Sequence, residues 1–291
     1  MARDNNATLK RRELLVWVAK LAFAGTLRDQ VDRIPVERYP KNGKTYRCCV
    51  HHSRAIVRQR LQALLGFSCE STDELRPLAD LAAEALARPA VSEPILTVVD
   101  EGCSACVRAN YFVTNACRGC LARPCTTVCP RQAITVQHGH SVIDPAACIS
   151  CGQCQKVCPY HAIIYVPIPC EEACPVGAIS QDEAGKEHID YRKCIYCGKC
   201  KQACPFGAIM EKSQIVDVIG ALQRPRPVVA LAAPAIAGQF PAAFGQIMRA
   251  CRDLGFTAVV EVAHGAEITA QREAEEFDER MRAGAPFMTS S

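Results

Sequence analysis

Apolar side chains in the first hundred residues recur at the spacing of amphipathic helices. The apolar positions of residues 56–65 fall on one helical face, and Gly66 stands where that helix would end. The apolar positions of residues 75–86 fit a second helix that ends near Pro89. The pattern therefore predicts a mostly helical region over residues 1–100.

The final third of the chain alternates continuous apolar runs with amphipathic stretches, which is typical of an α/β domain with a parallel sheet. The expected elements are, in order, a helix over 215–222 capped by Ser213, a stiff linker over 224–227, a buried strand over 228–233, a helix over 244–254 that stops at Gly255, a second buried strand over 257–263 and a charged helix over 268–281. Two strands leave sheet edges and faces uncovered. We therefore expect this domain either to be truncated at residue 291 or to need a partner.

Between these parts lies a cysteine-rich segment, Cys103 to Ile209, which holds sixteen of the chain's twenty cysteines. It repeats the phrase C-P-x-x-A-I four times, beginning at Cys129, Cys158, Cys174 and Cys204. Two of these phrases close full C-x2-C-x2-C-x3-C-P runs, which are Cys148, Cys151, Cys154 and Cys158, and Cys194, Cys197, Cys200 and Cys204. That spacing is typical of bacterial ferredoxins with [4Fe–4S] clusters, in which the fourth cysteine binds the other cluster of a pair.

Each full run suits an iron–sulfur cube for reasons of local geometry. Three cysteines within seven residues form a tight loop around three corners of the cube, so the fourth ligand comes from elsewhere. Gly152 and Gly198 follow the second cysteine of each run, where a positive φ eases the bend. Ile149 and Ile195 follow the first cysteine, where we expect them to shield the cluster from water. Free backbone N–H groups can donate hydrogen bonds to the sulfurs.

Disulfides, zinc and plain buried thiols are the alternative explanations for so many cysteines. Disulfides are typical of small secreted chains. Residues 10–12 before the apolar run 14–24 resemble a twin-arginine signal, but charges interrupt the run, no cleavage site follows, and the run is too short to span a membrane. Zinc sites prefer two well-separated C-x2-C pairs. We therefore predict iron–sulfur clusters, a reducing, anaerobic cytoplasm and no membrane partner.

The other cysteines of the segment complete an internal repeat. Shifts of 45 and 46 residues align its second half with its first, so the segment looks like a duplicated two-cluster ferredoxin. The second copy lacks counterparts of Cys117 and Cys120. The upstream Cys103 and Cys106 have the missing C-x2-C spacing and are placed to complete the set.

This repeat predicts four ligand sets, each with four cysteines. Set one is Cys117, Cys120, Cys125 and Cys158; set two is Cys148, Cys151, Cys154 and Cys129; set three is Cys194, Cys197, Cys200 and Cys174; set four is Cys103, Cys106, Cys170 and Cys204. A rival partition joins the two full runs to each other by exchanging Cys158 and Cys204. We expect at least two [4Fe–4S] clusters, and four if all sixteen cysteines bind iron.

Charge and the remaining cysteines add little to this interpretation. The net charge of +4 is spread thinly, and no basic block is dense enough to indicate nucleic acid as a partner. The Cys-Cys-x-His-His cluster at residues 48–52 is a possible metal site, although such clusters are more often incidental. We interpret Cys69 and Cys251 as core thiols.

The sequence resembles the [FeFe]-hydrogenases, in the monomeric branch with a ferredoxin-rich N-terminal region. The resemblance covers residues 45–291 and rests on several short motifs. These are Ala116-Cys117-Arg118-Gly119-Cys120, CPFGAI running into Lys212-Ser213-Gln214-Ile215, Ala233-Pro234-Ala235, Leu254-Gly255-Phe256, Gly265-Ala266-Glu267 before an acidic helix, and Pro286 to Ser291, which is similar to the approach to T-S-C-C-P.

The resemblance implies an oxidoreductase that oxidises hydrogen and reduces protons reversibly, with a ferredoxin or a similar redox protein as partner. In that family the cysteine that follows Ser291 would hold the six-iron H-cluster. We therefore transfer no catalytic residue to this sequence and expect an H-cluster only in a full-length protein. Whether the chain alone is an enzyme stays open, and we expect it to evolve no hydrogen. Its oligomeric state also stays open.

The predicted fold class is α+β, in four parts. These are a mostly helical region over 1–100, a polyferredoxin-like [4Fe–4S] domain over 101–212, a helix and linker over 213–227, and the start of a hydrogenase-like α/β domain over 228–291.

Two other functions remain as alternatives. A stand-alone polyferredoxin, or a four-cluster electron-transfer subunit of another oxidoreductase, would share the cysteine motifs, but the strand–helix–strand tail favours hydrogenase. A zinc-binding nucleic-acid module would need basic patches with aromatics, which are lacking. His161 near a cluster could couple protons to electrons, and Lys199 and Lys201 could attract an acidic ferredoxin. We favour plain surface roles for all three.

Overall fold

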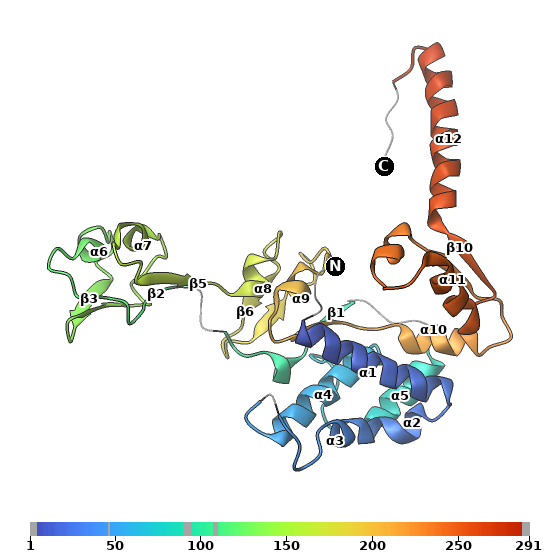
Figure 1. Ribbon diagram of the computed structural model, residues 1–291, viewed down its shortest axis with the longest axis horizontal. Coiled ribbons are helices and arrows are strands. Elements are labelled where there is room, and N and C mark those ends of the chain that lie inside the picture. The colour runs from blue at the N-terminus through green and yellow to red at the C-terminus, as the bar shows by residue number, and fades with distance from the viewer. Residues whose placement is uncertain (1–4, 46, 90–94, 107–109, 287–291) are drawn as a thin grey trace. The chain divides into compact units, whose positions relative to one another are not determined.

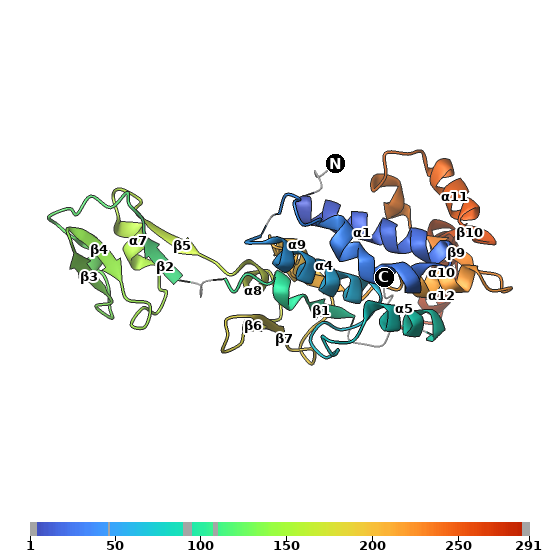
Figure 2. The same ribbon diagram turned by 90° about the horizontal axis from the view of Figure 1, so that it is seen from below.

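The computed structural model describes residues 5–45, 47–89, 95–106 and 110–286 (Figures 1 and 2). The chain divides into two compact units, each built from segments that are distant in sequence. The first unit comprises residues 1–31, 82–90 and 214–291, and the second comprises residues 32–81 and 91–213. Within the described ranges, no helix has both the length and the apolar character needed to cross a bilayer.

The first unit has a helical core in which α1 (Asn6–Phe23) packs along α10 (Ile215–Leu222), as Figure 1 shows. The buried residues of α1 are Leu14, Val18 and Ala22, which repeat every fourth position and so form one helical stripe. Val216 and Ile219 are the buried residues of α10. The short helix α2 (Leu27–Gln30) follows α1.

One ion pair links the end of α5 (Leu78–Ala87) to α10 inside the first unit. The Arg88 guanidinium donates two hydrogen bonds of 2.9 Å to the Asp217 carboxylate. Both side chains are nearly buried, so the paired geometry offsets the cost of removing two charges from water. The residue that precedes α10 is Gln214 and not Ser213 as predicted, because the Ser213 N–H instead donates to the Ala63 carbonyl at 2.9 Å.

The C-terminal segment forms the predicted β-α-β-α order. Strands β9 (Val229–Ala232) and β10 (Ala258–Glu261) pair in parallel, with η3 (Pro234–Gly238) and α11 (Phe244–Asp253) between them and α12 (Val262–Arg282) after them. The expectation that both strands are buried is wrong: Leu231 is 73% exposed and Val260 43%. A two-stranded sheet with one helix between its strands leaves most of its surface uncovered. Pro286 is the last described residue, so the T-S end of the sequence lies outside the described part.

The helices of the second unit differ from the prediction at one helix start. Helix α4 (Val50–Leu64) ends as expected before Gly66, whose φ of 88° is suited to a helix end. Helix α5 begins at Leu78, and Leu75 lies outside it, 89% exposed. The Asp32 carboxylate accepts the N–H groups of Leu78 and Ala79, both at 3.0 Å, and so caps the helix at that point. The remaining short helices here are η1 (Val31–Arg33) and α3 (Ile34–Arg38).

The cysteine-rich segment folds into two lobes of the same design. The first lobe (residues 110–166) contains the antiparallel pair β2 (Asn110–Val113) and β5 (Ile163–Val166), the hairpin β3 (Ile134–Gln137) and β4 (His140–Ile143), and helices α6 (Pro124–Thr127) and α7 (Gln153–Val157). The second lobe (residues 95–106 and 169–213) contains the pair β1 (Leu96–Val98) and β8 (Ile209–Glu211), the hairpin β6 (Ile179–Gln181) and β7 (Glu187–Ile189), helices α8 (Pro169–Glu172) and α9 (Lys199–Ala203), and η2 (Asp100–Gly102).

Equivalent hydrogen bonds confirm the duplication. The Asp144 N–H donates to the Ala133 carbonyl in the first lobe, and the Asp190 N–H donates to the Ala178 carbonyl in the second, both at 2.8 Å. The first strand of the second lobe, β1, precedes the first lobe in the chain. The first lobe is therefore inserted between the two parts of the second.

Candidate iron–sulfur centres

The C-x2-C loops that begin at Cys103, Cys117, Cys148 and Cys194 bend in the same way. The residue before the second cysteine has a positive φ in each loop, at Ala105 (45°), Gly119 (58°), Ser150 (53°) and Tyr196 (54°). This left-handed bend costs about 1–2 kcal/mol at a residue other than glycine, so something else in each loop must hold it. In the two full runs the N–H of this same residue donates to the sulfur of the first cysteine: Ser150 N–H to Cys148 Sγ and Tyr196 N–H to Cys194 Sγ, both at 3.4 Å.

All four C-P-x-x-A-I phrases form the same turn as well. The residue before the alanine has a positive φ, at Gln132 (49°), His161 (49°), Gly177 (59°) and Gly207 (61°). In every phrase the alanine N–H donates to the cysteine sulfur: Ala133 to Cys129 (3.3 Å), Ala162 to Cys158 (3.4 Å), Ala178 to Cys174 (3.2 Å) and Ala208 to Cys204 (3.5 Å). Such N–H···S bonds stabilise negative charge on sulfur, and in iron–sulfur sites they raise the reduction potential.

The two predicted glycines act as expected. Gly152 and Gly198 have φ values of 73° and 75° and precede the first residues of α7 and α9. The third cysteine of each run thereby enters a helix and is buried. Ile149 and Ile195, which we expected to shield the clusters, are more than half exposed, although Ile149 lines a cavity together with Cys148 and Cys151.

Two cavities in the first lobe are each lined by four cysteines. The first is lined by Cys117, Cys120, Cys125 and Cys158, together with Val113, Ser141 and Ile163. The second is lined by Cys129, Cys148, Cys151 and Cys154, together with Tyr111, Ile134 and Ile143. These groupings coincide with ligand sets one and two. In each cavity the C-x2-C loop meets a cysteine from the other half of the lobe.

The second lobe brings together the cysteines of sets three and four. One cavity is lined by Cys103, Cys106, Cys170 and Cys204, which is set four. Cys174, Cys194 and Cys200 of set three pack against the same core, and Cys197 is exposed. Cys158 and Cys204 therefore lie where the first partition expects them. The rival partition would need them exchanged between the lobes.

Three contacts that the sequence did not indicate attach Cys103 and Cys106 to the second lobe. The Lys186 ammonium donates to the carbonyls of Asp100 (2.9 Å) and Cys103 (3.3 Å). The Gln181 amide donates to the Cys106 carbonyl at 2.6 Å. The pairing of β1 with β8 places the same loop beside the last C-P-x-x-A-I phrase.

Helix α4 supports that last phrase from the other side. The Arg60 guanidinium donates to the carbonyls of Phe206 (3.1 Å) and Gly207 (3.4 Å). The Arg47 guanidinium lies over the Phe206 ring, 5.3 Å from its centroid, at cation–π distance. Burial lowers the pKa of Arg60, but a guanidinium keeps its charge at any ordinary pH. The helical region thus places positive charge beside the site of set four.

The thiols of the cavities have unequal proton affinities. Burial raises the pKa of Cys154, Cys200 and Cys170, most strongly at Cys170. Hydrogen bonding, chiefly from the Ser141 N–H, lowers the pKa of Cys117 to about 7. Because iron binds the thiolate, the buried thiols lose their protons only when a cation offsets the loss.

The chemistry of the donor set tests whether the set four cavity fits an iron–sulfur cluster. Its four cysteine sulfurs are the ligands that such a cluster takes. Glu187 also lines this cavity and is 7% exposed. Neither of its oxygens makes a hydrogen bond of normal geometry, and burial raises the pKa of its carboxyl. A neutral Glu187 carboxyl is compatible with the negative charge of a cluster held by four thiolates, so the lining residues fit this group.

No single-ion site is evident in the described ranges, since nowhere do three or more His, Cys, Asp or Glu side chains converge as they would around one metal ion. An iron–sulfur cube is wider than one ion, so its four ligands surround a larger space. Accordingly, the cysteines and histidines at residues 48–52 do not bring three ligands together around one metal ion.

The remaining predicted side chains have ordinary positions. His161 and Lys199 are exposed, and Lys201 pairs with Glu211 at 2.7 Å. Cys69 is a core thiol that donates to the Gln59 carbonyl at 3.2 Å. Cys251 is half-buried and not in a core as predicted, because its helix, α11, covers only one face of a small sheet.

Comparison with known proteins finds two families that match different parts of the chain. Residues 141–164 and 187–210 match the family described as 4Fe-4S binding domain. Each range runs from the second strand of a hairpin through a full cysteine run. Residues 226–291 match the family described as iron only hydrogenase large subunit, C-terminal domain.

Several curated proteins resemble part of this chain. A 7Fe ferredoxin of Hydrogenibacillus schlegelii is 39% identical over 62 residues, which cover 21% of this chain and 80% of that protein. The electron transport protein HydN of Escherichia coli is 37% identical over 60 residues, 21% of this chain and 34% of HydN. The putative electron transport protein YsaA of the same organism is 42% identical over 48 residues, 16% of this chain and 31% of YsaA. The chain therefore spans about a third of the length of these two E. coli relatives.

These matches agree with the geometry of the lobes. The residues that match the 4Fe-4S binding domain lie in the two lobes, and the relatives are named as ferredoxins and electron transport proteins. The chain binds [4Fe–4S] clusters and transfers electrons. It belongs to the ferredoxin family of 4Fe-4S binding proteins, and after its two lobes it continues into a segment similar to the C-terminal domain of the iron-only hydrogenase large subunit.

Proposed function

We propose that this chain is the electron-transfer portion of an [FeFe]-hydrogenase, and that it passes electrons between a ferredoxin, or a similar redox protein, and a hydrogenase domain whose beginning is the β9–α12 segment. The observation that carries this proposal is that two features occur in the same chain. Its two lobes gather cysteines in fours around cavities, and its last 66 residues match a hydrogenase domain. The family reaction is reversible oxidation of hydrogen.

We assign the sixteen cysteines of the four sets as ligands of four [4Fe–4S] clusters. The cavities support three of these sets directly, and the packing of Cys174, Cys194 and Cys200 supports the remaining one. When bound, such a cluster takes up and releases one electron at a time.

The residues around the cysteines hold the clusters and set their potentials. Backbone N–H groups of the alanine turns donate to ligand sulfurs in every set. Arg60 adds a positive charge next to set four. Both effects favour the reduced, more negative state of a site, which raises its potential. Burial of the third cysteine of each run limits the access of water.

A stand-alone polyferredoxin remains the second candidate. It is favoured by the match to a small ferredoxin, because the chain covers 80% of that protein with only 62 residues. It gives no reason for the hydrogenase match over residues 226–291. The codons that follow Ser291 in the gene distinguish the two: a T-S-C-C-P continuation is expected, and a stop codon would leave the polyferredoxin as the better proposal.

The cluster count is tested by iron analysis of the chain after anaerobic reconstitution. Four clusters of four irons give about sixteen irons per chain. Replacing Cys120 or Cys106 with alanine should each lower the count to about twelve, since one set loses a ligand. Cys251→Ala, outside the sets, should leave it at about sixteen. A value near eight in the parent chain would show that only the two full runs bind clusters.

A further inference from the structure

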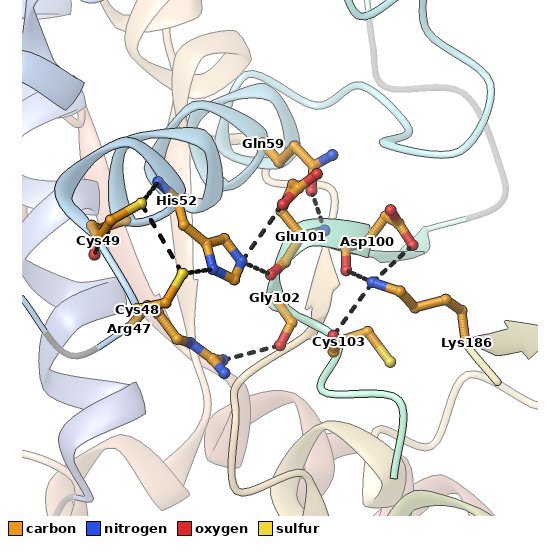
Figure 3. A network of polar contacts seen from close by, with 11 residues as sticks. Arg47, Cys48, Cys49, His52, Gln59, Asp100, Glu101, Gly102, Cys103 and Lys186 are labelled. Atoms are coloured by element: carbon orange, nitrogen blue, oxygen red, sulfur yellow. Dashed lines mark hydrogen bonds and ion pairs between the residues drawn. The ribbon is translucent and has the colours of Figure 1, made fainter. Parts of the chain in front are cut away.

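Two neighbouring cysteines, Cys48 and Cys49, lie outside the four ligand sets, just before the start of α4 (Figure 3). Cys48 Sγ is 3.3 Å from His52 Nδ1 and 3.9 Å from Cys49 Sγ. Both cysteines are exposed to solvent. No set needs them, and two neighbouring thiols with an imidazole form an arrangement capable of thiol chemistry.

The orientation of His52 is determined by its other ring nitrogen. Nε2 lies 3.0 Å from the Glu101 carbonyl oxygen and 3.4 Å from the Glu101 carboxylate. A carbonyl oxygen can only accept, so Nε2 carries the proton. In the neutral imidazole Nδ1 is then the acceptor, and it faces the Cys48 thiol (Figure 3). Cys48 is thus a nucleophile that contacts the base His52, and Glu101 orients that base.

Cys49 occupies a different environment, at the N-terminus of the 15-residue helix α4. Its sulfur accepts the His52 N–H at 3.4 Å. This hydrogen bond is the main reason that the pKa of the Cys49 thiol is lowered. A thiolate at a helix N-terminus is the reactive form of cysteine. Cys49 is therefore suited to be the first nucleophile, which attacks a disulfide. Cys48, beside the base His52, is suited to be the second nucleophile, which attacks Cys49.

We propose that Cys48 and Cys49 form a redox-active dithiol that exchanges with low-molecular-weight disulfides of the glutathione type. The Cys49 thiolate attacks one sulfur of the disulfide, forms a mixed disulfide and releases one thiolate. The Cys48 thiol passes its proton to His52 Nδ1 and attacks Cys49 Sγ, which releases the second thiolate. The two released thiolates end as thiols, one with the proton held by His52 and one with the proton lost earlier by Cys49. Two protein thiols are oxidised and one external disulfide is reduced.

The product disulfide would be easily reduced. Adjacent residues have Cα atoms about 3.8 Å apart, which is shorter than the usual 4.4–6.8 Å range of a disulfide. Strained disulfides have higher potentials and are the labile ones. The dithiol is therefore suited to reversible oxidation by the thiol pool and not to a structural crosslink.

The test uses the cluster-loaded chain, in which the ligand cysteines are occupied, treated with glutathione disulfide and followed by mass spectrometry. The parent chain should lose two hydrogens, with both mapped to the peptide that carries Cys48 and Cys49. Cys48→Ser should instead accumulate one glutathione on Cys49, because ring closure is blocked. Cys69 should stay unmodified, since burial raises its pKa to about 12. A Cys48→Ser chain that gains no glutathione would overturn the proposal.

The role of His52 is tested with a matched pair of variants. His52→Asn should slow ring closure by about tenfold or more, as expected for loss of a general base, and the slowed step should become faster with rising pH. His51→Asn, at the exposed neighbouring position, should leave the rate unchanged. Unchanged iron content in both variants shows that the fold is intact. Equal rates for the two variants would remove His52 from the mechanism and overturn the assignment.

Discussion

At the scale of single residues, the cysteine loops depend on backbone conformations that side chains normally avoid. Ala105, Ser150 and Tyr196 have positive φ values although none is a glycine. The sequence indicated the glycine positions Gly152 and Gly198, because glycine is the residue that prefers such angles. It could not indicate the others, because their strain is offset by N–H···S bonds and by packing that form only in the folded lobe.

Gly119 and Gly177 provide a test of this strain. Both have a positive φ, 58° and 59°. A Cβ on Gly119 would overlap the carbonyl oxygen of Gly139, whereas a Cβ on Gly177 would meet open space. Gly119→Ala should therefore lose the cluster of set one and lower the iron content to about twelve per chain. Gly177→Ala should keep all clusters and lose only about 1 kcal/mol of stability.

Iron analysis and denaturant unfolding of both variants check this expectation. Because the two positions share the same backbone angle, any difference between the variants reports the overlap with Gly139 and not the angle. Equal iron contents in the two variants would contradict the structure around Gly119.

At the scale of elements, helix α5 shows how a distant residue fixes a boundary. The periodic pattern continued through Leu75, so the sequence predicted an earlier start. Asp32, 46 residues before Leu78, instead supplies the cap. A cap of this kind does not appear in a local pattern, because it comes from another part of the fold.

We expect Asp32→Ala to destabilise the chain by about 1 kcal/mol, the usual loss for an N-cap carboxylate. Asp29→Ala removes an equal charge from an exposed position nearby and should change the unfolding free energy by less than about 0.5 kcal/mol. Urea denaturation of both variants measures the difference. Equal losses would mean that the carboxylate of Asp32 does not cap α5.

At the scale of the whole molecule, the two lobes differ in charge. The first lobe (residues 110–166) contains four Lys and Arg and one Asp or Glu, a net charge of +3. The second lobe (residues 95–106 and 169–213) contains six Lys and Arg and nine Asp or Glu, a net charge of −3. The sequence directed attention to Lys199 and Lys201 as attractors of an acidic partner. Lys201 is paired with Glu211, so the excess of positive charge belongs to the first lobe.

On the proposed function, an acidic ferredoxin should therefore reduce the cluster-loaded chain at a rate that falls with ionic strength. The double variant Arg131→Gln/Lys156→Gln in the first lobe should slow this reaction at low salt and weaken the dependence of its rate on salt concentration. The same replacement of Arg192 and Lys199 in the second lobe is the control, since it removes two exposed charges. Stopped-flow absorbance measures both. A larger effect from the control would place docking on the second lobe.

The sequence by itself determined the chemistry of this protein. Cysteine spacing is a property of short loops, and so are the C-P turns and the order of helices and strands, because each depends on residues close together in the chain. The tertiary structure alone decided what distant residues do. It joined Cys103 and Cys106 to a lobe that continues 63 residues later, it brought Arg60 to the last cysteine turn, and it left β9 and β10 partly exposed. Such contacts follow from packing between segments far apart in sequence, and no local pattern specifies them.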